Sequence, residues 1–64
     1  MRRVILTTPN CRECRIKKVR FEDMGLPLDE IEADSEQGKM LIERFDLKKA
    51  GTIIDLDEMR ILDE

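Results

Sequence analysis

The chain has 64 residues, of which 42% are charged and 41% apolar, and its formal net charge is −3. A chain of this length forms one small domain that buries only about 60% of the surface of its unfolded state, so we predict a single domain over residues 1–64. The acidic balance and the presence of only two aromatic residues, Phe21 and Phe45, argue against a nucleic-acid partner.

No segment of the sequence is typical of membrane insertion or export. Its apolar runs are far shorter than the ~20 residues that cross a bilayer, and the short apolar run after Met1-Arg2-Arg3 is too brief for a signal peptide. We therefore expect a cytoplasmic protein with no membrane partner. In that compartment two cysteines favour redox chemistry or metal binding over a structural disulfide.

The first predicted element is a buried strand over residues 2–8. Its centre is the apolar run Val4-Ile5-Leu6, and the threonines at its end are β-branched. Pro9 ends the strand, and Asn10 is a favourable N-cap for a following helix. The sequence thus predicts a strand, a tight turn and a helix start in close succession.

The helix is predicted over residues 12–24, because Gly25 is a typical C-cap and Pro27 prevents its continuation. We expect its core-facing side to come from its apolar positions, Ile16, Val19, Phe21 and Met24. Basic residues gather along the same helix, namely Arg12, Arg15, Lys17, Lys18 and Arg20. They are interpreted either as a solvated face or as an electropositive surrounding for the nearby cysteines.

A weaker strand is predicted over residues 28–33, where acidic residues favour an edge position. Asp34 then begins a second helix, because Asp34-Ser35-Glu36-Gln37 has the form of a capping box. The apolar side of this helix consists of Met40, Leu41, Ile42 and Phe45. Gly38 weakens it by about 1 kcal/mol relative to alanine, so we expect this glycine to mark close packing on the sheet.

Two short strands are predicted over residues 52–56 and 59–62, joined by Asp57-Glu58 as a two-residue turn. Ile53 faces one side of the sheet and Ile54 the other. The pairs expected to share a face are Ile54 with Leu56, and Met59 with Ile61.

The predicted order of elements is β-α-β-α-β-β. The first two strands flank a helix and should be parallel by the right-handed crossover rule, whereas the last two form an antiparallel hairpin. We therefore predict an α/β fold with a four-stranded mixed sheet and one helix on each face.

Both cysteines, Cys11 and Cys14, lie at the junction between the first strand and the first helix. The first turn of a helix has unpaired N–H groups and a partial positive charge, which stabilise a thiolate and lower the pKa of its thiol. One helical turn separates the two cysteines, so they can close a disulfide and act as a two-electron centre. The alternative is half of a zinc site, whose missing ligands must be carboxylates or come from a second chain, because the sequence has no histidine and no third cysteine.

The segment Thr7-Thr8-Pro9-Asn10-Cys11-Arg12-Glu13-Cys14 resembles the active-site entry of glutaredoxins and other small thioredoxin-like redoxins. Residues 45–55 resemble the segment that in this family runs from the second helix through a cis-proline into the third strand, and the likeness covers nearly the whole chain. The resemblance implies a thioredoxin-like (glutaredoxin-like) fold with the sheet order second, first, third, fourth strand. It also implies disulfide exchange with Cys11 as the nucleophile and Cys14 as the resolving thiol.

The sequence departs from the family pattern in three places. Gly51 occupies the cis-proline position, which lines the substrate groove. The last helix of the family is missing, so apolar side chains of the final hairpin should be exposed and invite a homodimer through the uncovered sheet face. The features that bind glutathione are poor, since Thr8 replaces a frequent lysine and the Gly-Gly segment after the last strand is absent.

The leading hypothesis is a thiol–disulfide oxidoreductase or electron carrier that reduces protein disulfides and is itself reduced by a thiol reductase or glutathione. It uses no cofactor beyond the redox-active disulfide and no metal. The residues expected to line the substrate groove or to tune the thiol pKa are Thr8, Pro9, Asn10, Arg12, Glu13, Arg15, Ala50, Gly51 and Thr52. The alternative is a truncated redoxin-fold binding or adaptor module, with or without a bound metal, whose cysteines form a structural or regulatory disulfide.

Overall fold

The computed structural model describes residues 2–63, where four strands and two helices follow in the predicted order. The strands are β1 (Arg3–Thr7), β2 (Asp29–Glu32), β3 (Ile53–Asp55) and β4 (Arg60–Asp63), and the helices are α1 (Arg12–Asp23) and α2 (Glu36–Phe45). Their bounds differ from the predicted ones by at most two residues. Met1 and Glu64, the ends of the predicted domain, lie outside the described residues.

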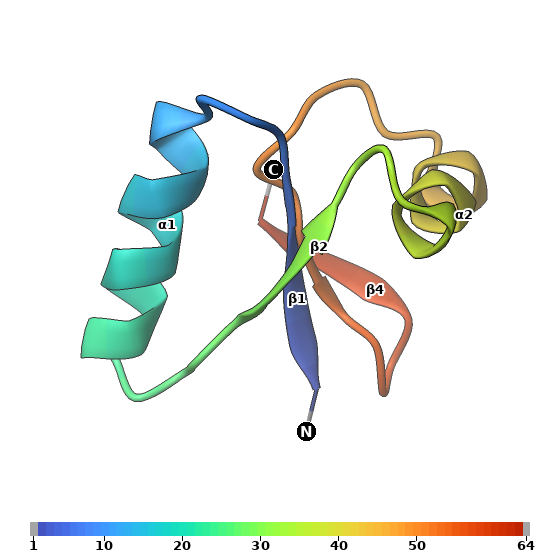
Figure 1. The fold of residues 1–64 in the computed structure, drawn as a ribbon. Coiled ribbons are helices and arrows are strands. Elements are labelled where there is room, and N and C mark those ends of the chain that lie inside the picture. Colours follow the sequence, from blue (N-terminus) through green and yellow to red (C-terminus); the bar gives the residue numbers. More distant parts are fainter. Residues whose placement is uncertain (1, 64) are drawn as a thin grey trace.

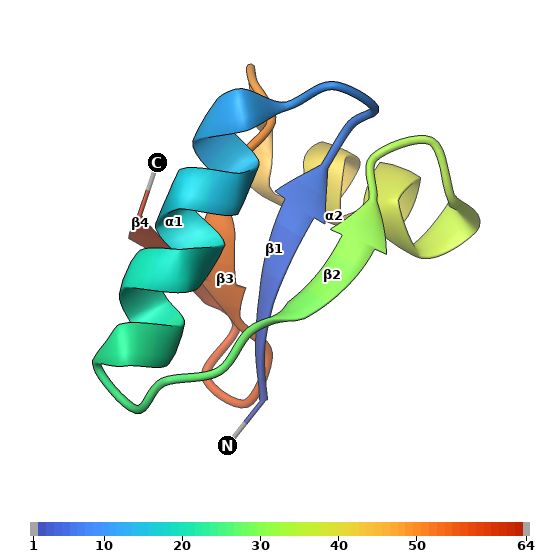
Figure 2. The ribbon, with the colours of Figure 1, turned by 60° about the vertical axis from the view of Figure 1, so that its left-hand side comes forward.

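The four strands form one mixed sheet in the order β2-β1-β3-β4. β1 is parallel to β2 and antiparallel to β3, which is in turn antiparallel to β4. Helix α1 covers one face of the sheet and α2 covers the other, as two views of the ribbon show (Figure 1, Figure 2). The predicted α/β architecture is therefore confirmed, and so is the edge position of β2.

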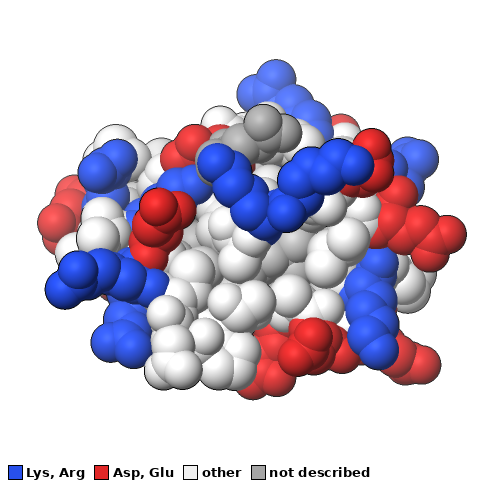
Figure 3. All heavy atoms as spheres, turned by 90° about the horizontal axis from the view of Figure 1, so that it is seen from above, with Lys and Arg blue, Asp and Glu red and all other residues white. Residues whose placement is uncertain are grey.

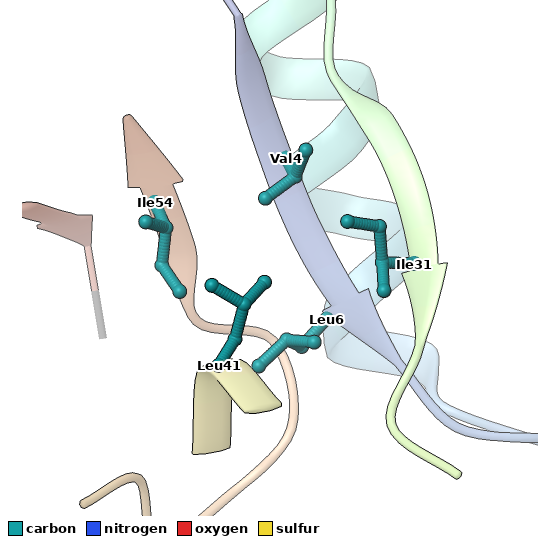
Figure 4. Close-up of a cluster of buried hydrophobic side chains, with 5 residues drawn as sticks. All are labelled: Val4, Leu6, Ile31, Leu41 and Ile54. Atoms are coloured by element: carbon teal, nitrogen blue, oxygen red, sulfur yellow. The ribbon is translucent and has the colours of Figure 1, made fainter. Parts of the chain in front are cut away.

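The sheet carries a hydrophobic cluster on each face. The α2-side cluster consists of Val4, Leu6, Ile31, Leu41 and Ile54 (Figure 4). The α1-side cluster consists of Ile5, Cys14, Leu28 and Ile53. Successive residues of a strand point to opposite faces, so β1 contributes to both clusters and Ile53 and Ile54 separate as predicted. One of the two cysteines is thus part of the core.

Helix α1 turns a different side toward the sheet from the predicted one. Cys14 is buried and Phe21 is half-buried against the α1-side cluster, whereas Ile16, Val19 and Met24 are 50%, 57% and 56% exposed. Positions 14, 17, 18 and 21 share one face of a helix, and the two lysines among them are half-buried. The prediction for Ile16, Val19 and Met24 is wrong because the contacts of Cys14 and Phe21 with the sheet set the orientation of the helix.

Helix α2 has its N-cap one residue later than predicted. Ser35, not Asp34, is the cap, and its Oγ accepts the backbone N–H of Gly38 at 3.0 Å. The N–H of Ser35 donates to the carbonyl of Glu32 at 3.0 Å, so the end of β2 fixes where the helix starts. The predicted close packing at Gly38 is confirmed, because a Cβ atom there would overlap the carbonyl oxygen of Glu32.

The hairpin between β3 and β4 turns over residues 56–59 instead of at the predicted Asp57-Glu58. Oδ1 of the buried Asp55 accepts the backbone N–H groups of Asp57 at 2.9 Å and Glu58 at 3.2 Å. A two-residue turn favours glycine, which this segment lacks, and the wider turn instead places a φ of 52° at Met59. Met59 therefore lies in the turn, so the predicted strand face that it shares with Ile61 is wrong.

The apolar side chains of the hairpin strands are better covered than predicted. Leu56, Ile61 and Leu62 are half-buried and pack against the two clusters. Within residues 2–63 the large apolar side chains that are exposed are Ile16, Val19, Met24, Met40 and Met59. Exposed apolar surface is therefore concentrated on α1 more than on the strands of the hairpin.

Candidate active site

The two cysteines form a disulfide at the start of α1, with Cα atoms 5.4 Å apart. Cys14 is 3% exposed and belongs to the α1-side cluster, whereas Cys11 is half-buried. Cys11 is therefore the more exposed of the two cysteines.

A tight turn brings Cys11 to the start of the helix. The carbonyl of Thr8 accepts the N–H of Cys11 at 3.2 Å, and Pro9 and Asn10 lie between them. Asn10 has a φ of 66°, which a type II turn requires at its third residue and which asparagine tolerates. The prediction that Asn10 caps the helix is therefore wrong, because a capping residue has an extended backbone.

Cys11 itself is the N-cap of α1, and its Sγ accepts the backbone N–H of Cys14 at 3.2 Å. After reduction, this N–H and the positive end of the helix lie next to the Cys11 sulfur and favour its thiolate form. We therefore expect the pKa of the reduced Cys11 thiol to lie below the ~8.5 of a free cysteine.

The segment before β3 packs against the buried sulfur of the disulfide, although none of its residues lines the hollow there. The N–H of Gly51 donates to the carbonyl of Leu6 at 2.7 Å, and the N–H of Leu6 donates to the carbonyl of Thr52 at 3.0 Å. The Sγ of Cys14 lies 3.5 Å from the same Leu6 carbonyl. A Cβ atom on Gly51, whose φ is 88°, would lie 3.8 Å from that Sγ. Gly51 thus lies directly beside the disulfide. The peptide bonds of residues 2–63 are all trans, so this segment has no cis peptide bond at the position where the family has its cis-proline.

Lys17, predicted only as one member of the basic cluster on this helix, lies close to the disulfide. Its ammonium group donates to the carbonyl of Gly51 at 3.0 Å and lies 4.0 Å from Oδ2 of Asp63. The side chain is only 16% exposed, and its Nζ would lie 3.7 Å from the same Gly51 Cβ that approaches Cys14. The helical spacing could have indicated that Lys17 lies near the disulfide, because a residue three positions after Cys14 is on the same side of the helix.

The predicted groove residues differ in how close they lie to the disulfide. Thr8, Asn10 and Arg15 line a hollow of about 180 Å³ that also contains both cysteines. Figure 3 views this end of the molecule, where an uncharged surface runs from the centre to the lower edge of the view, between Lys and Arg side chains on one side and Asp and Glu side chains on the other. These three residues are therefore placed where they can contact a bound target.

The other predicted residues have different surroundings. Arg12 lines an adjoining hollow, whereas Pro9 and Glu13 are exposed and line neither. Ala50 packs half-buried against the α1-side cluster, and the buried Thr52 donates its hydroxyl to the carbonyl of Lys49 at 3.2 Å. Thr52 thus holds the Gly51 segment in place, whereas Ala50 also lines another hollow together with Thr8.

Replacing Lys17 with methionine should make the reduction potential of the cysteine pair more negative by about 30 mV, a tenfold change in the equilibrium. The ammonium group favours thiolates, which exist only in the reduced protein, so its loss destabilises that form. The potential is measured in a glutathione buffer, with Lys17→Arg as the variant that keeps the charge. Equal shifts in both variants would show that packing, not charge, is the cause.

Comparison with known proteins gives no match to a family model, to a curated protein or to a solved structure. Within residues 2–63, no group of three or more side chains of the metal-binding types is assembled. Neither helix of this part of the chain has the length and apolar character that crossing a membrane requires.

Proposed function

We propose that this protein is a thiol–disulfide oxidoreductase with a thioredoxin-like (glutaredoxin-like) fold. The fold assignment is supported by the sheet order β2-β1-β3-β4 and by the position of the cysteine pair between β1 and α1. Both features agree with what the resemblance to glutaredoxins implies. The observation that carries the function is the pairing of an accessible, helix-capping Cys11 with a buried Cys14.

The proposed reaction starts from the reduced protein. The Cys11 thiolate attacks one sulfur of a target disulfide, which forms a mixed disulfide and expels the other target sulfur as a thiolate that takes up a proton. Cys14 loses its proton to solvent and attacks the Cys11 sulfur, which closes the Cys11–Cys14 disulfide and releases the second target sulfur. The second target sulfur also leaves as a thiolate and takes up a proton. The protein thus loses two electrons and the one proton of Cys14, and the target gains two electrons and two protons, the second of which comes from solvent because Cys11 reacts as the thiolate.

A second thiol compound must return the protein to its reduced form. It supplies two electrons and two protons, either as the dithiol of a thiol reductase or as two molecules of glutathione. Thr8 lines the hollow at the disulfide, at the position where glutaredoxins often have lysine. A protein dithiol is therefore the reductant that these residues favour, and the cycle uses no cofactor besides the disulfide.

Equilibration with a glutathione redox buffer tests this proposal. The fraction of disulfide is read from the mass shift after alkylation of free thiols. We expect a reversible two-electron couple between about −180 and −270 mV, the range of known exchange catalysts. A disulfide that never forms, or one that resists reduction far below about −300 mV, would contradict the proposal.

The second candidate is a binding or adaptor module whose cysteines form a structural or regulatory disulfide. It is favoured by Gly51 at the cis-proline position and by the exposed Ile16 and Val19 on α1. Thiol reactivity measured against pH separates the candidates, since a Cys11 pKa well below ~8.5 supports exchange and one near ~8.5 supports the module. Sedimentation at rising concentration tests the homodimer that the sequence predicts, which a monomer at every concentration would exclude.

A further inference from the structure

Two hollows adjoin at the start of α1. The first contains Cys11 and Cys14, and the second, of about 310 Å³, is lined by Asn10, Arg12, Arg15 and Ile16. Asn10 and Arg15 line both hollows. Together they form a groove that leads from the accessible sulfur to the outer face of the helix, and we call it the arginine groove.

The arginine groove carries positive charge that the described chain does not neutralise. Among residues 2–63, neither Arg12 nor Arg15 forms an ion pair. Glu30, which borders the first hollow, lies 3.2 Å from the ammonium group of Lys18, which also lies 3.9 Å from Glu22, so Glu30 is directed toward Lys18 and forms no ion pair with either arginine. The start of α1 adds a partial positive charge at the same place. An anionic group is therefore attracted to this groove.

The end of the groove away from the disulfide is apolar. Ile16 lines it and is 50% exposed, and Val19, which is 57% exposed, follows on the same side of the helix. Covering such side chains removes apolar surface from water and is favourable. An occupant with an acidic group near the disulfide and an apolar group farther along matches both ends of the groove.

We propose that the arginine groove selects target proteins in which an acidic residue, followed by an apolar one, flanks the disulfide. This specificity rests on the proposed function. The acidic side chain contacts Arg15 and Arg12 while the target sulfur meets Cys11, and the apolar side chain lies against Ile16. The bonds that form and break are those of the exchange reaction described above.

Two synthetic peptides test the selection. Each contains one intramolecular disulfide followed by an apolar residue, and they differ only in having glutamate or lysine beside the cysteine. Their rates of reduction by the fully reduced protein are measured at low and at high salt. We expect the glutamate peptide to react about tenfold faster at low salt, with a smaller difference at high salt, because exposed charges are screened.

Variants on α1 identify the source of the selection. Arg15→Glu should remove or invert the preference for the glutamate peptide. Arg20→Glu changes the net charge equally and lies on the same helix, but Arg20 lines neither hollow and forms no ion pair within residues 2–63. It should therefore keep the preference, and circular dichroism checks that both variants are folded.

The outcomes separate the selection from the activity. Equal rates for the two peptides, or a preference that Arg15→Glu and Arg20→Glu alter alike, would overturn the arginine groove and leave the oxidoreductase proposal intact. Failure of the wild-type protein to reduce either peptide would overturn both.

Discussion

Replacing Cys11 with serine should abolish the reduction of disulfide targets. Cys11 is the half-buried cysteine at the helix start, whereas Cys14 is 3% exposed, so Cys11 is the thiol expected to attack a target. Loss of a nucleophile lowers a catalysed rate by at least roughly 10³-fold. The measurement is the rate at which reduced protein converts a disulfide peptide to its dithiol.

The matched variant is Cys14→Ser, which should fail in a different way. Its Cys11 thiolate still attacks the peptide, but the protein has no second thiol to resolve the mixed disulfide, and alkylation of the thiol freed in the peptide blocks the reverse attack. A stable one-to-one adduct should accumulate and be visible by mass spectrometry under non-reducing conditions. An adduct on Cys14 in the Cys11→Ser variant, with none on Cys11 in the Cys14→Ser variant, would reverse the proposed roles.

Replacing Gly38 with alanine should destabilise the fold by about 3 kcal/mol, since overpacking against a rigid neighbour costs 1–3 kcal/mol or more. A Cβ atom at this position would overlap the carbonyl oxygen of Glu32 and lie 3.0 Å from the Cα of Ala33. Both neighbours are backbone atoms, so neither can move as a side chain would. The helix propensity gained by alanine, about 1 kcal/mol, offsets only part of this cost.

Urea denaturation of the reduced and of the oxidised protein measures this effect. Gln37→Ala is the control, because Gln37 is the exposed neighbour of Gly38 in α2 and surface substitutions usually change stability by less than about 0.5 kcal/mol. A domain of this size is marginally stable, so the alanine variant should be largely unfolded at moderate urea. An unchanged midpoint for Gly38→Ala would show that α2 does not pack closely on the end of β2.

The junction between β1 and α1, which contains both cysteines, was largely predictable from local features of the sequence. Val4-Ile5-Leu6 forms the buried strand β1, and the proline after its end precedes a helix that starts within one residue of Cys11. These elements could be predicted because a strand or helix pattern and the residues that end it lie within a few positions of one another in the sequence. The residue that caps the helix was not predictable in this way, because a positive φ at Asn10 depends on how the turn closes.

The orientation of α1 and the surroundings of the disulfide depend on contacts between distant parts of the chain. Lys17 donates to the carbonyl of Gly51, which lies 34 residues away. Its spacing from Cys14 places Lys17 on the core-facing side of the helix but does not indicate this distant partner. The same docking buries Cys14 and leaves Ile16 and Val19 exposed. The local apolar pattern of α1 cannot predict which of its faces is buried, because the free energy of burial depends on the side chains of the sheet that each face contacts. The order of elements and the cysteine pair thus follow from the sequence, whereas the cation beside the disulfide and the groove at the start of α1 arise from packing.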